Sequence, residues 1–260
     1  MILTIDIGNS RIKVASWQSD KIIARAVVAY SVNDLLNDFD KLFSEWVLSD
    51  ELPSHVYVVN VAGSEISQAL MVWIRQHWQL EICFLKTEKQ YKDVINAYDD
   101  PAQHGVDRWA GVVAGHQCFS DFSVCVISAG TAITFDFINK NGQHLGGYIL
   151  PSYNTMHAAL LADAMNVAAV FDVQNYKCNV KGSIPNNTND AVNQGLHKFI
   201  QAGVREFCQL AKDKMDAPVK IIITGGFAKT ILTYPDMPVM HHEPDLVMQG
   251  LYDVMKYYER

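Results

Sequence analysis

Two stretches of this sequence share one pattern: an apolar run ends in a small polar turn with glycine, and a second β-rich run follows. They cover residues 2–14 and 124–136. Glycine lets the backbone approach a phosphate chain, and hydroxyl and amide side chains add hydrogen-bond donors. A third turn, at 224–226, has two glycines before an expected helix, whose N-terminus favours anions. Together the three turns predict a nucleotide phosphate site.

The first turn carries the widest choice of ligands. Asp6 ends the first apolar run, and a carboxylate there can hold Mg²⁺ through water. Gly8, Asn9 and Ser10 offer backbone and side-chain donors, and Lys13 offers a point charge for the same phosphates. The structural alternative is a plain hairpin rich in Asp and Asn, a common turn composition.

The second turn predicts the partner of the first. Gly130 and Thr131 are expected to face the β- and γ-phosphates of the nucleotide. Taken alone, this turn also fits a tight hairpin. Its recurrence in each half of the chain, together with the third turn, favours the phosphate site.

An acidic and a basic residue, Asp107 and Arg108, are neighbours in the first turn of an expected helix. Phosphoryl transfer to an alcohol needs a carboxylate that accepts or orients the hydroxyl proton. A guanidinium beside it can clamp a substrate carboxylate or the migrating phosphoryl group. The alternative is an acidic residue that favours the helix dipole next to a solvated arginine.

The order of three strands, a helix, a strand and a helix occurs about twice along the chain. This repetition predicts a duplicated α/β fold with a cleft between the copies, in which these residues are positioned. We place the domain boundary near residue 118, giving domains 1–118 and 119–260. The expected strands are 2–7, 11–17, 22–30, 55–61, 81–85, 123–128, 132–138, 144–150 and 219–223. The main expected helices are 32–49, 64–77, 106–119, 153–165, 190–213 and 245–258, and 174–190 is expected to be rich in loops.

Composition excludes several classes of function. The net charge is −7 and no Lys/Arg cluster occurs, so we expect no nucleic-acid partner. No run reaches the roughly 20 apolar residues of a membrane span, and no leader pattern opens the chain, so we expect no membrane partner. The five cysteines are dispersed without a C-x-x-C pair, which is typical of reduced thiols in a cytoplasmic protein.

In their order, the motifs resemble the type III pantothenate kinase family, within the superfamily of acetate kinase, sugar kinases, Hsp70 and actin. They are D-x-G-N-S/T-x-x-K at residues 6–13, Y-x-x-P-x-x-x-G-x-D-R at 98–108, x-x-G-T-A-x-T-x-D at 128–136, G-G-x-I-x-P at 146–151, and T-G-G at 224–226. The resemblance implies two duplicated ribonuclease H-like (actin-like ATPase) domains with mixed sheets and an active-site cleft between them.

The resemblance also implies an activity: ATP-dependent phosphorylation of the primary hydroxyl of pantothenate to 4'-phosphopantothenate, the first step of coenzyme A biosynthesis. Asp107 takes the position of the general base, and Mg²⁺ accompanies ATP. The implied ATP contacts are Asp6, Ile7, Gly8, Asn9, Ser10, Arg11, Ile12, Lys13 and Thr131. The implied pantothenate contacts are Tyr98, Gly105, Val106, Asp107, Arg108 and Thr188. In the family this threonine comes from the neighbouring subunit of a homodimer with a shared active site, and K⁺ or NH₄⁺ commonly supports catalysis.

The sequence departs from the family pattern at two positions. Ser128 stands where the family often has an Asp that holds the monovalent cation, and a hydroxyl is the poorer ligand, so the cation requirement is left open. Ser152 replaces a glycine after the G-G-x-I-x-P motif, which predicts a changed backbone angle or hydrogen bond. Two other functions stay open: a kinase of another small hydroxyl substrate, and a non-catalytic regulatory accessory factor of the same fold.

Overall fold

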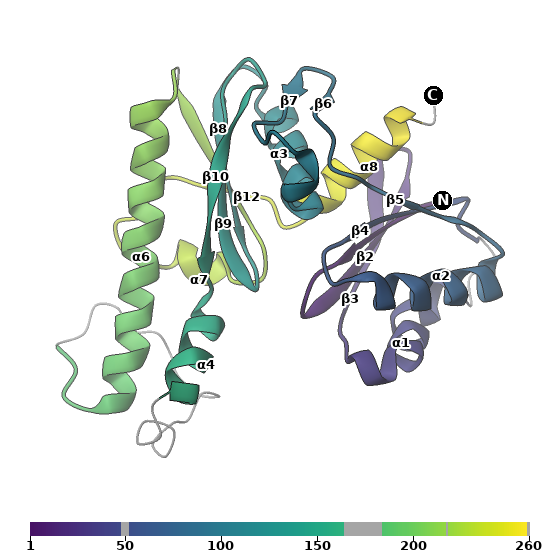
Figure 1. The fold of residues 1–260 in the computed structure, drawn as a ribbon, viewed down its shortest axis with the longest axis horizontal. Coiled ribbons are helices and arrows are strands. Elements are labelled where there is room, and N and C mark those ends of the chain that lie inside the picture. Colours follow the sequence, from purple (N-terminus) through teal and green to yellow (C-terminus); the bar gives the residue numbers. More distant parts are fainter. Residues whose placement is uncertain (48–51, 164–183, 217, 259–260) are drawn as a thin grey trace. The chain divides into compact units, whose positions relative to one another are not determined.

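The computed structural model describes residues 1–47, 52–163, 184–216 and 218–258 (Figure 1). The chain forms two compact units, Met1–Gln117 with Asp245–Arg260 and Cys118–Pro244. The first division falls next to the expected boundary at residue 118. The C-terminal helix, which the sequence analysis assigns to the second domain, groups with the first unit instead. Among the described residues, no helix is both long and apolar enough to cross a bilayer.

Each unit contains a five-stranded mixed sheet with the same strand order, in which the first three strands are antiparallel and the last two pairings are parallel. In the first unit the order is β3 (Lys21–Ala29), β2 (Arg11–Gln18), β1 (Ile2–Ile7), β4 (His55–Asn60) and β5 (Ile82–Phe84). In the second it is β10 (His144–Pro151), β9 (Ala132–Ile138), β8 (Ser123–Ala129), β11 (Val219–Thr224) and β12 (His241–His242). The expected duplication is therefore confirmed.

The helices follow the predicted order with small shifts at their ends. They are α1 (Leu35–Val47), α2 (Ser64–Trp78), α3 (Val106–Cys118), α4 (Tyr153–Asp163), α6 (Thr188–Lys214), α7 (Ala228–Leu232) and α8 (Leu246–Tyr258). Helix α6 begins two residues before the expected start because the side chain of Asn187 accepts a hydrogen bond from Asp190 N. Most of the expected loop at 174–190 lies outside the described residues.

Three short strands were not predicted. The strands β6 (Gln90–Tyr91) and β7 (Val94–Ile95) form a small hairpin within the connection that precedes α3. Lys92, in the turn of this hairpin, has a φ of 51°, a left-handed conformation that a lysine in the sequence does not predict. The third element is β12, whose two residues pair with β11 at the end of the second sheet. Each of these strands is too short to produce a period-2 signal.

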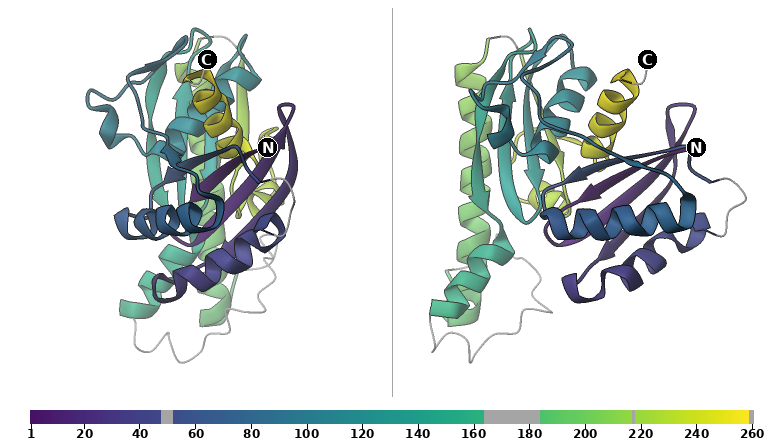
Figure 2. Two further views of the ribbon diagram at one scale, coloured as in Figure 1. Left: turned by 90° about the vertical axis from the view of Figure 1, so that its right-hand side faces the viewer. Right: turned by 45° about the vertical axis from the view of Figure 1, so that its right-hand side comes forward.

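The central strand β1 is covered on both faces (Figure 2). Leu3, Ile5 and Ile7 belong to one hydrophobic core with apolar residues of α1 and α2. The alternate residues of β1 point to the opposite face, because successive side chains of a strand alternate. Helix α8 packs against β1 and β4, and its Met248 and Tyr252 form a second cluster with Ala15 and Trp17 of β2. Burial of this face explains why α8 groups with the first unit.

The second unit is built around the long helix α6, which lies along its sheet (Figure 1). Ile200, Val204 and Cys208 on α6 form one core with apolar residues of β8, β9 and β11. The strand β8 is buried along almost its whole length. A buried central strand that ends in a polar turn holds that turn rigidly, as β1 does in the first unit.

Candidate active site

Asp6 and Lys13 lie directly opposite each other on the antiparallel strands β1 and β2. Lys13 Nζ donates to Asp6 Oδ2 at 3.0 Å, and the Asp6 side chain is only 8% exposed. The expected Mg²⁺ ligand and the expected phosphate lysine are therefore brought together as an ion pair. This pair places a mobile positive charge beside a fixed carboxylate, which suits a site for phosphate and metal.

The turn between these strands is fixed by two hydrogen bonds. Gly8 N donates to Arg11 O at 3.0 Å, and Tyr30 Oη donates to Gly8 O at 3.0 Å. Two of the expected ATP contacts, Ile7 and Ile12, have fully buried side chains. Contact of those two residues with a ligand would therefore be limited to the backbone. The remaining turn residues, Asn9, Ser10 and Arg11, are exposed.

Residues within the proposed substrate motif, 98–108, contact one another. Arg108 is buried, its Nη1 donates to Tyr98 Oη at 3.2 Å, and its guanidinium carbon lies 5.9 Å from the centroid of the Tyr98 ring. The Tyr98 ring stacks on the buried His104 ring, with centroids 4.8 Å apart. Tyr98 N also donates to the side chain of Asn96 at 3.0 Å, which holds the loop in place. The guanidinium is thereby pre-oriented for a planar anion such as a carboxylate.

Asp107 lies in the first turn of α3, where Val106 is the first helical residue and Trp109 N donates to Gly105 O. Its Oδ1 accepts a hydrogen bond from Arg108 N at 2.8 Å. A β-carbon on Gly105 would lie 2.9 Å from that same oxygen, so a larger residue there would have to move the end of the Asp107 side chain.

The electrostatic surroundings of Asp107 suit a base. Burial raises the pKa of Asp107 above its ordinary value of 3.8, and the negative charge of Asp6 raises it further. The N–H group and the charge of Arg108 act in the opposite direction. The influence of Asp6 means that the two carboxylates, 101 positions apart in the sequence, lie near each other in the fold.

In the second unit, the turn after β8 is clamped by the T-G-G segment. Gly130 N donates to Ala132 O at 2.9 Å, and Phe227 N donates to Ala129 O at 3.0 Å. Gly225 has a φ of +95°, and a β-carbon there would lie 2.6 Å from the carbonyl carbon of Ala129. Only glycine permits this approach, which holds two of the three predicted turns against each other.

The two positions that depart from the family pattern have clear structural roles. Ser152 is buried, and its Oγ lies 3.1 Å from Thr155 Oγ1, which donates to Thr131 O at 3.0 Å. Through Thr155, Ser152 ties the start of α4 to the turn that carries Thr131. Ser128 is the next-to-last residue of β8 and lies in register with Thr134 of β9 and Thr224 of β11. It offers a neutral hydroxyl where a carboxylate would attract a cation more strongly.

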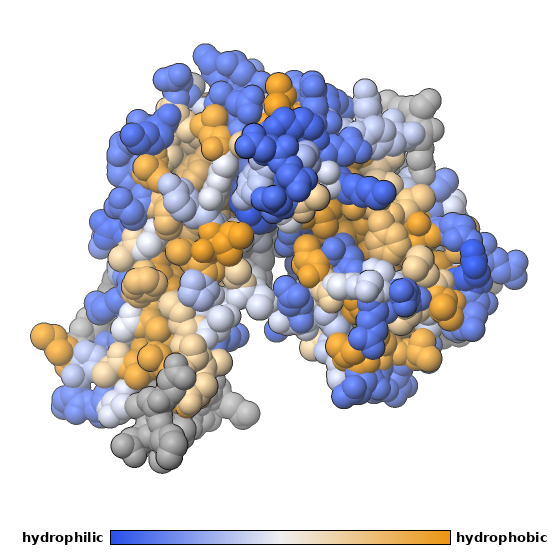
Figure 3. Space-filling model, in the orientation of Figure 1, coloured by the Kyte–Doolittle hydropathy of each residue, from blue (hydrophilic) through white to orange (hydrophobic). Residues whose placement is uncertain are grey.

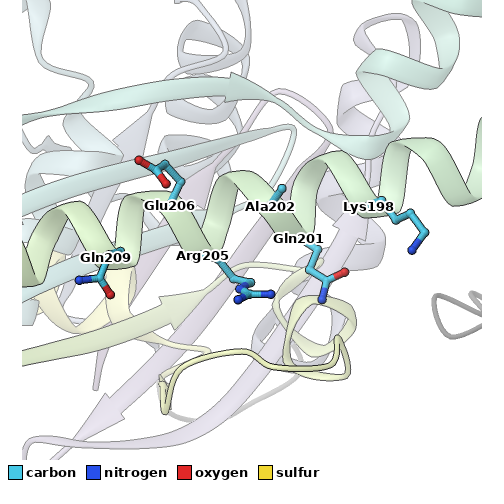
Figure 4. A pocket seen from close by; sticks show the side chains of 6 residues that line it. All are labelled: Lys198, Gln201, Ala202, Arg205, Glu206 and Gln209. Carbon is cyan, nitrogen blue, oxygen red and sulfur yellow. The ribbon is translucent and has the colours of Figure 1, made fainter.

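Thr188, the remaining expected contact, is the first residue of α6 and is exposed. Two residues that hold these segments were not predicted: His104, whose ring stacks on Tyr98, and Thr155 of α4, which donates to the carbonyl of Thr131. Neither has a spacing signal, since both act through contacts that form only in the folded chain. Figure 4 shows another hollow, lined by polar and charged side chains of α6. It contains none of the predicted site residues.

Known proteins resemble this chain over nearly its whole length. The family described as type III pantothenate kinase matches residues 2–209. A type III pantothenate kinase of Nitrosococcus oceani is 31% identical over 98% of this chain and 94% of its own length. The corresponding protein of Acinetobacter baumannii strain ACICU is 30% identical over 99% of this chain and 98% of its own.

Solved structures support the fold. A putative 2-dehydro-3-deoxygalactonokinase from Sinorhizobium meliloti has a TM-score of 0.62 at 11% identity and covers 99% of both chains. A putative Baf family transcriptional activator from Campylobacter jejuni has a TM-score of 0.54 at 22% identity, over 99% of this chain and 98% of its own. The duplicated mixed sheets and these neighbours confirm the ribonuclease H-like fold. On the family match and the near-full-length relatives, this chain belongs to the type III pantothenate kinase family.

Proposed function

We propose an active site for ATP-dependent phosphorylation of pantothenate, the activity of the family. It consists of Asp6, Lys13, Tyr98, Asp107 and Arg108. The observation that carries this assignment is the environment of Asp107. A carboxylate with a raised pKa, next to a second carboxylate and a buried arginine, is the arrangement that a general base for an alcohol requires.

In this proposal, Asp107 accepts or orients the proton of the pantothenate primary hydroxyl as its oxygen attacks the γ-phosphorus of ATP. The raised pKa makes the carboxylate a stronger base. Arg108, held by Tyr98, binds the carboxylate of pantothenate or the transferred phosphoryl group. Phosphoryl transfer depends mainly on positioning and charge stabilisation, which these fixed groups provide.

The residues present fit Mg²⁺ and ATP. Asp6 supplies the carboxylate oxygen that Mg²⁺ prefers. Because Asp6 is buried and interacts with the negative charge of Asp107, a cation beside it would be stabilised. Lys13 supplies part of this positive charge and can turn to a phosphate, since its side chain is 36% exposed. When bound, Mg²⁺ would neutralise the β- and γ-phosphates. Thr131 and the exposed turn residues Asn9, Ser10 and Arg11 remain proposed ATP contacts.

We propose only a weak requirement for K⁺ or NH₄⁺. The proposal rests on Ser128, because a neutral hydroxyl binds a monovalent cation less strongly than the carboxylate that the family often has there. Turnover measured in Na⁺, K⁺ and NH₄⁺ should differ by less than about tenfold, and Ser128→Asp should increase the K⁺ dependence. A strict K⁺ requirement in the unaltered chain would contradict this assignment.

We also propose a homodimer in which Thr188 contacts pantothenate of the neighbouring subunit. Support comes from apolar side chains exposed on β10, α4 and α6 of the second unit; the view in Figure 3 shows apolar surface on both units. These exposed residues are Tyr148, Ile149, Leu160 and Phe199. Exposed apolar surface of this kind commonly marks an interface. Light scattering after size exclusion should give twice 29.1 kDa; a monomer that turns over normally would overturn the shared site.

We propose that the reaction takes place in the cytoplasm, because the buried Cys125 and Cys208 are free thiols, as expected of a reducing compartment. The activity is tested by ADP formation with MgATP, with and without pantothenate. Dependence of ADP formation on pantothenate would support the proposed function. ATP turnover with a different small alcohol, but not with pantothenate, would reassign the substrate.

A further inference from the structure

Helix α8 meets α3 at a glycine. A β-carbon on Gly250 would lie 2.6 Å from the carbonyl carbon of Ala110 and 3.1 Å from its α-carbon. Real β-carbons essentially never approach backbone atoms so closely, and a backbone atom cannot rotate away as a side-chain end can. The two helices can therefore adopt this separation only because residue 250 has no side chain.

Neither helix is free to yield at this crossing. On α3, every residue from Arg108 to His116 is buried, and His116 lies 2.9 Å from Asp93. A buried helix packed on all sides cannot shift without disturbing several contacts at once.

Helix α8 is held from its other side. Tyr252 stacks on Trp17 with a centroid separation of 4.2 Å and donates to Asp20 at 2.7 Å. Tyr91 donates to Asp253 O at 2.9 Å, and Arg25 forms a two-point ion pair with Asp245. These contacts hold α8 in place. A side chain added at Gly250 must therefore be accommodated at the contact between α8 and α3.

The contact lies one helical turn from the proposed base, since Asp107 precedes Ala110 by three residues. A displacement of α3 by ~1 Å at Ala110 would move the Asp107 carboxylate by a similar amount, and a misplacement of that size can cost about 10²-fold in rate. The family match ends at residue 209, so it does not include α8.

We propose that Gly250 is a positioning residue for catalysis: by allowing α8 to lie against the backbone of α3, it sets the position of Asp107 and Arg108 in the site. The inference rests on the proposed role of Asp107. It assigns to the C-terminal helix a function in the reaction, in addition to covering the sheet.

The test is Gly250→Ala, assayed for pantothenate-dependent ADP formation across pH. We expect kcat to fall between about 10-fold and 10²-fold, with KM for ATP changed less than about twofold, because the phosphate turns are not touched. The acidic limb of the kcat profile should move to lower pH. We expect the displacement to make Asp107 less buried and to increase its distance from Asp6, whereas Arg108 on the same helix and Lys13 beside Asp6 keep their charges.

Two controls separate positioning from stability. Gly203→Ala adds the same methyl to another helix, where it would meet Leu150 at an ordinary 3.7 Å, and should leave kcat and its pH profile unchanged. Leu251→Ala removes a fully buried side chain next to Gly250 on α8. It should lower the melting temperature while keeping the pH profile of the unaltered protein, since it adds no atom at the crossing.

Amide hydrogen exchange in α3, measured without substrate, gives a readout that does not depend on activity. We expect faster exchange in the first turn of α3 in Gly250→Ala than in Gly203→Ala. If Gly250→Ala does not fold, Ala110→Gly loosens the same crossing without adding an atom and should lower kcat several-fold with the same direction of pH shift.

Normal kcat and an unmoved acidic limb in the folded Gly250→Ala protein, or in Ala110→Gly where it does not fold, would overturn the inference. The proposed function is judged separately, by the unaltered protein and Asp107→Asn. If the unaltered protein shows no pantothenate-dependent turnover, the function fails. If it turns over and needs Asp107, a normal Gly250→Ala rejects only the positioning role.

Discussion

Replacing Asp107 with asparagine should separate activity from stability. The change is nearly isosteric, and the amide oxygen can still accept the hydrogen bond that Arg108 N donates to Oδ1 at 2.8 Å. What disappears is a basic, negatively charged oxygen. General base catalysis contributes about 10²–10⁴-fold, so kcat should fall by that factor, or roughly 2.7–5.4 kcal/mol in the activation barrier. KM for ATP should stay within about threefold, since the nucleotide turns are unaltered.

The same substitution should increase stability at neutral pH. The folded state raises the pKa of Asp107 above 3.8 through burial and the charge of Asp6. The folded carboxyl therefore holds its proton more tightly than the unfolded chain does. The unaltered protein loses stability as pH rises from about 3.8 through the raised pKa, whereas Asp107→Asn does not. The variant should melt at a higher temperature at pH 7, and the difference should vanish below about pH 3.8.

Coupled-enzyme measurement of ADP, together with thermal melts at pH 3.5, 5 and 7, tests both parts. Near-normal kcat in the variant would reject Asp107 as the base. A variant that is less stable than the unaltered protein at pH 7 would refute the electrostatic reasoning, because it would mean that the carboxylate stabilises the fold. In that case, the loss of activity would reflect damage to the site and not removal of a base.

Three further substitutions test other parts of the structure. Arg108→Lys removes the planar donors that Tyr98 orients and should raise KM for pantothenate at least about tenfold, near 1.4 kcal/mol, with KM for ATP unchanged in the same titrations. Gly225→Ala forces a β-carbon against the Ala129 backbone at a φ of +95° and should weaken ATP binding by calorimetry; unchanged affinity would dissociate this turn from the nucleotide. Trp17→Ala opens a cavity under Tyr252 and should cost about 3–5 kcal/mol in urea unfolding, and a loss below about 1 kcal/mol would show that α8 is not anchored there.

Much of the fold could be predicted because its signals are local. The continuous buried run of β1, the glycine turn after it and the return of β2 follow from residues within about 15 positions of each other. The Asp6–Lys13 pair belongs to the same hairpin, so the register of that hairpin alone brings the two side chains together. Repetition of this unit in the second half then implied the duplicated sheets.

The short strands, and the unit with which helix α8 packs, could not be predicted in this way. The β6–β7 hairpin has two residues on each strand and a left-handed Lys92, so no periodicity reveals it. The amphipathic pattern of α8 predicts a helix but not the surface that it covers. That surface is supplied by Ala15 and Trp17, more than 200 positions earlier.

Residue types and their order along the chain were enough to indicate the candidate chemical groups: the polar turns that end buried strands, the acidic and basic residues at the start of α3, and the order of motifs that places the chain in its family. How those groups behave depends on the folded arrangement. The raised pKa of Asp107 depends on burial and on Asp6, and the separation of α3 from α8 depends on a glycine 140 positions after Ala110. Charge interactions and packing act over distances in space, and spacing along the chain does not encode these distances.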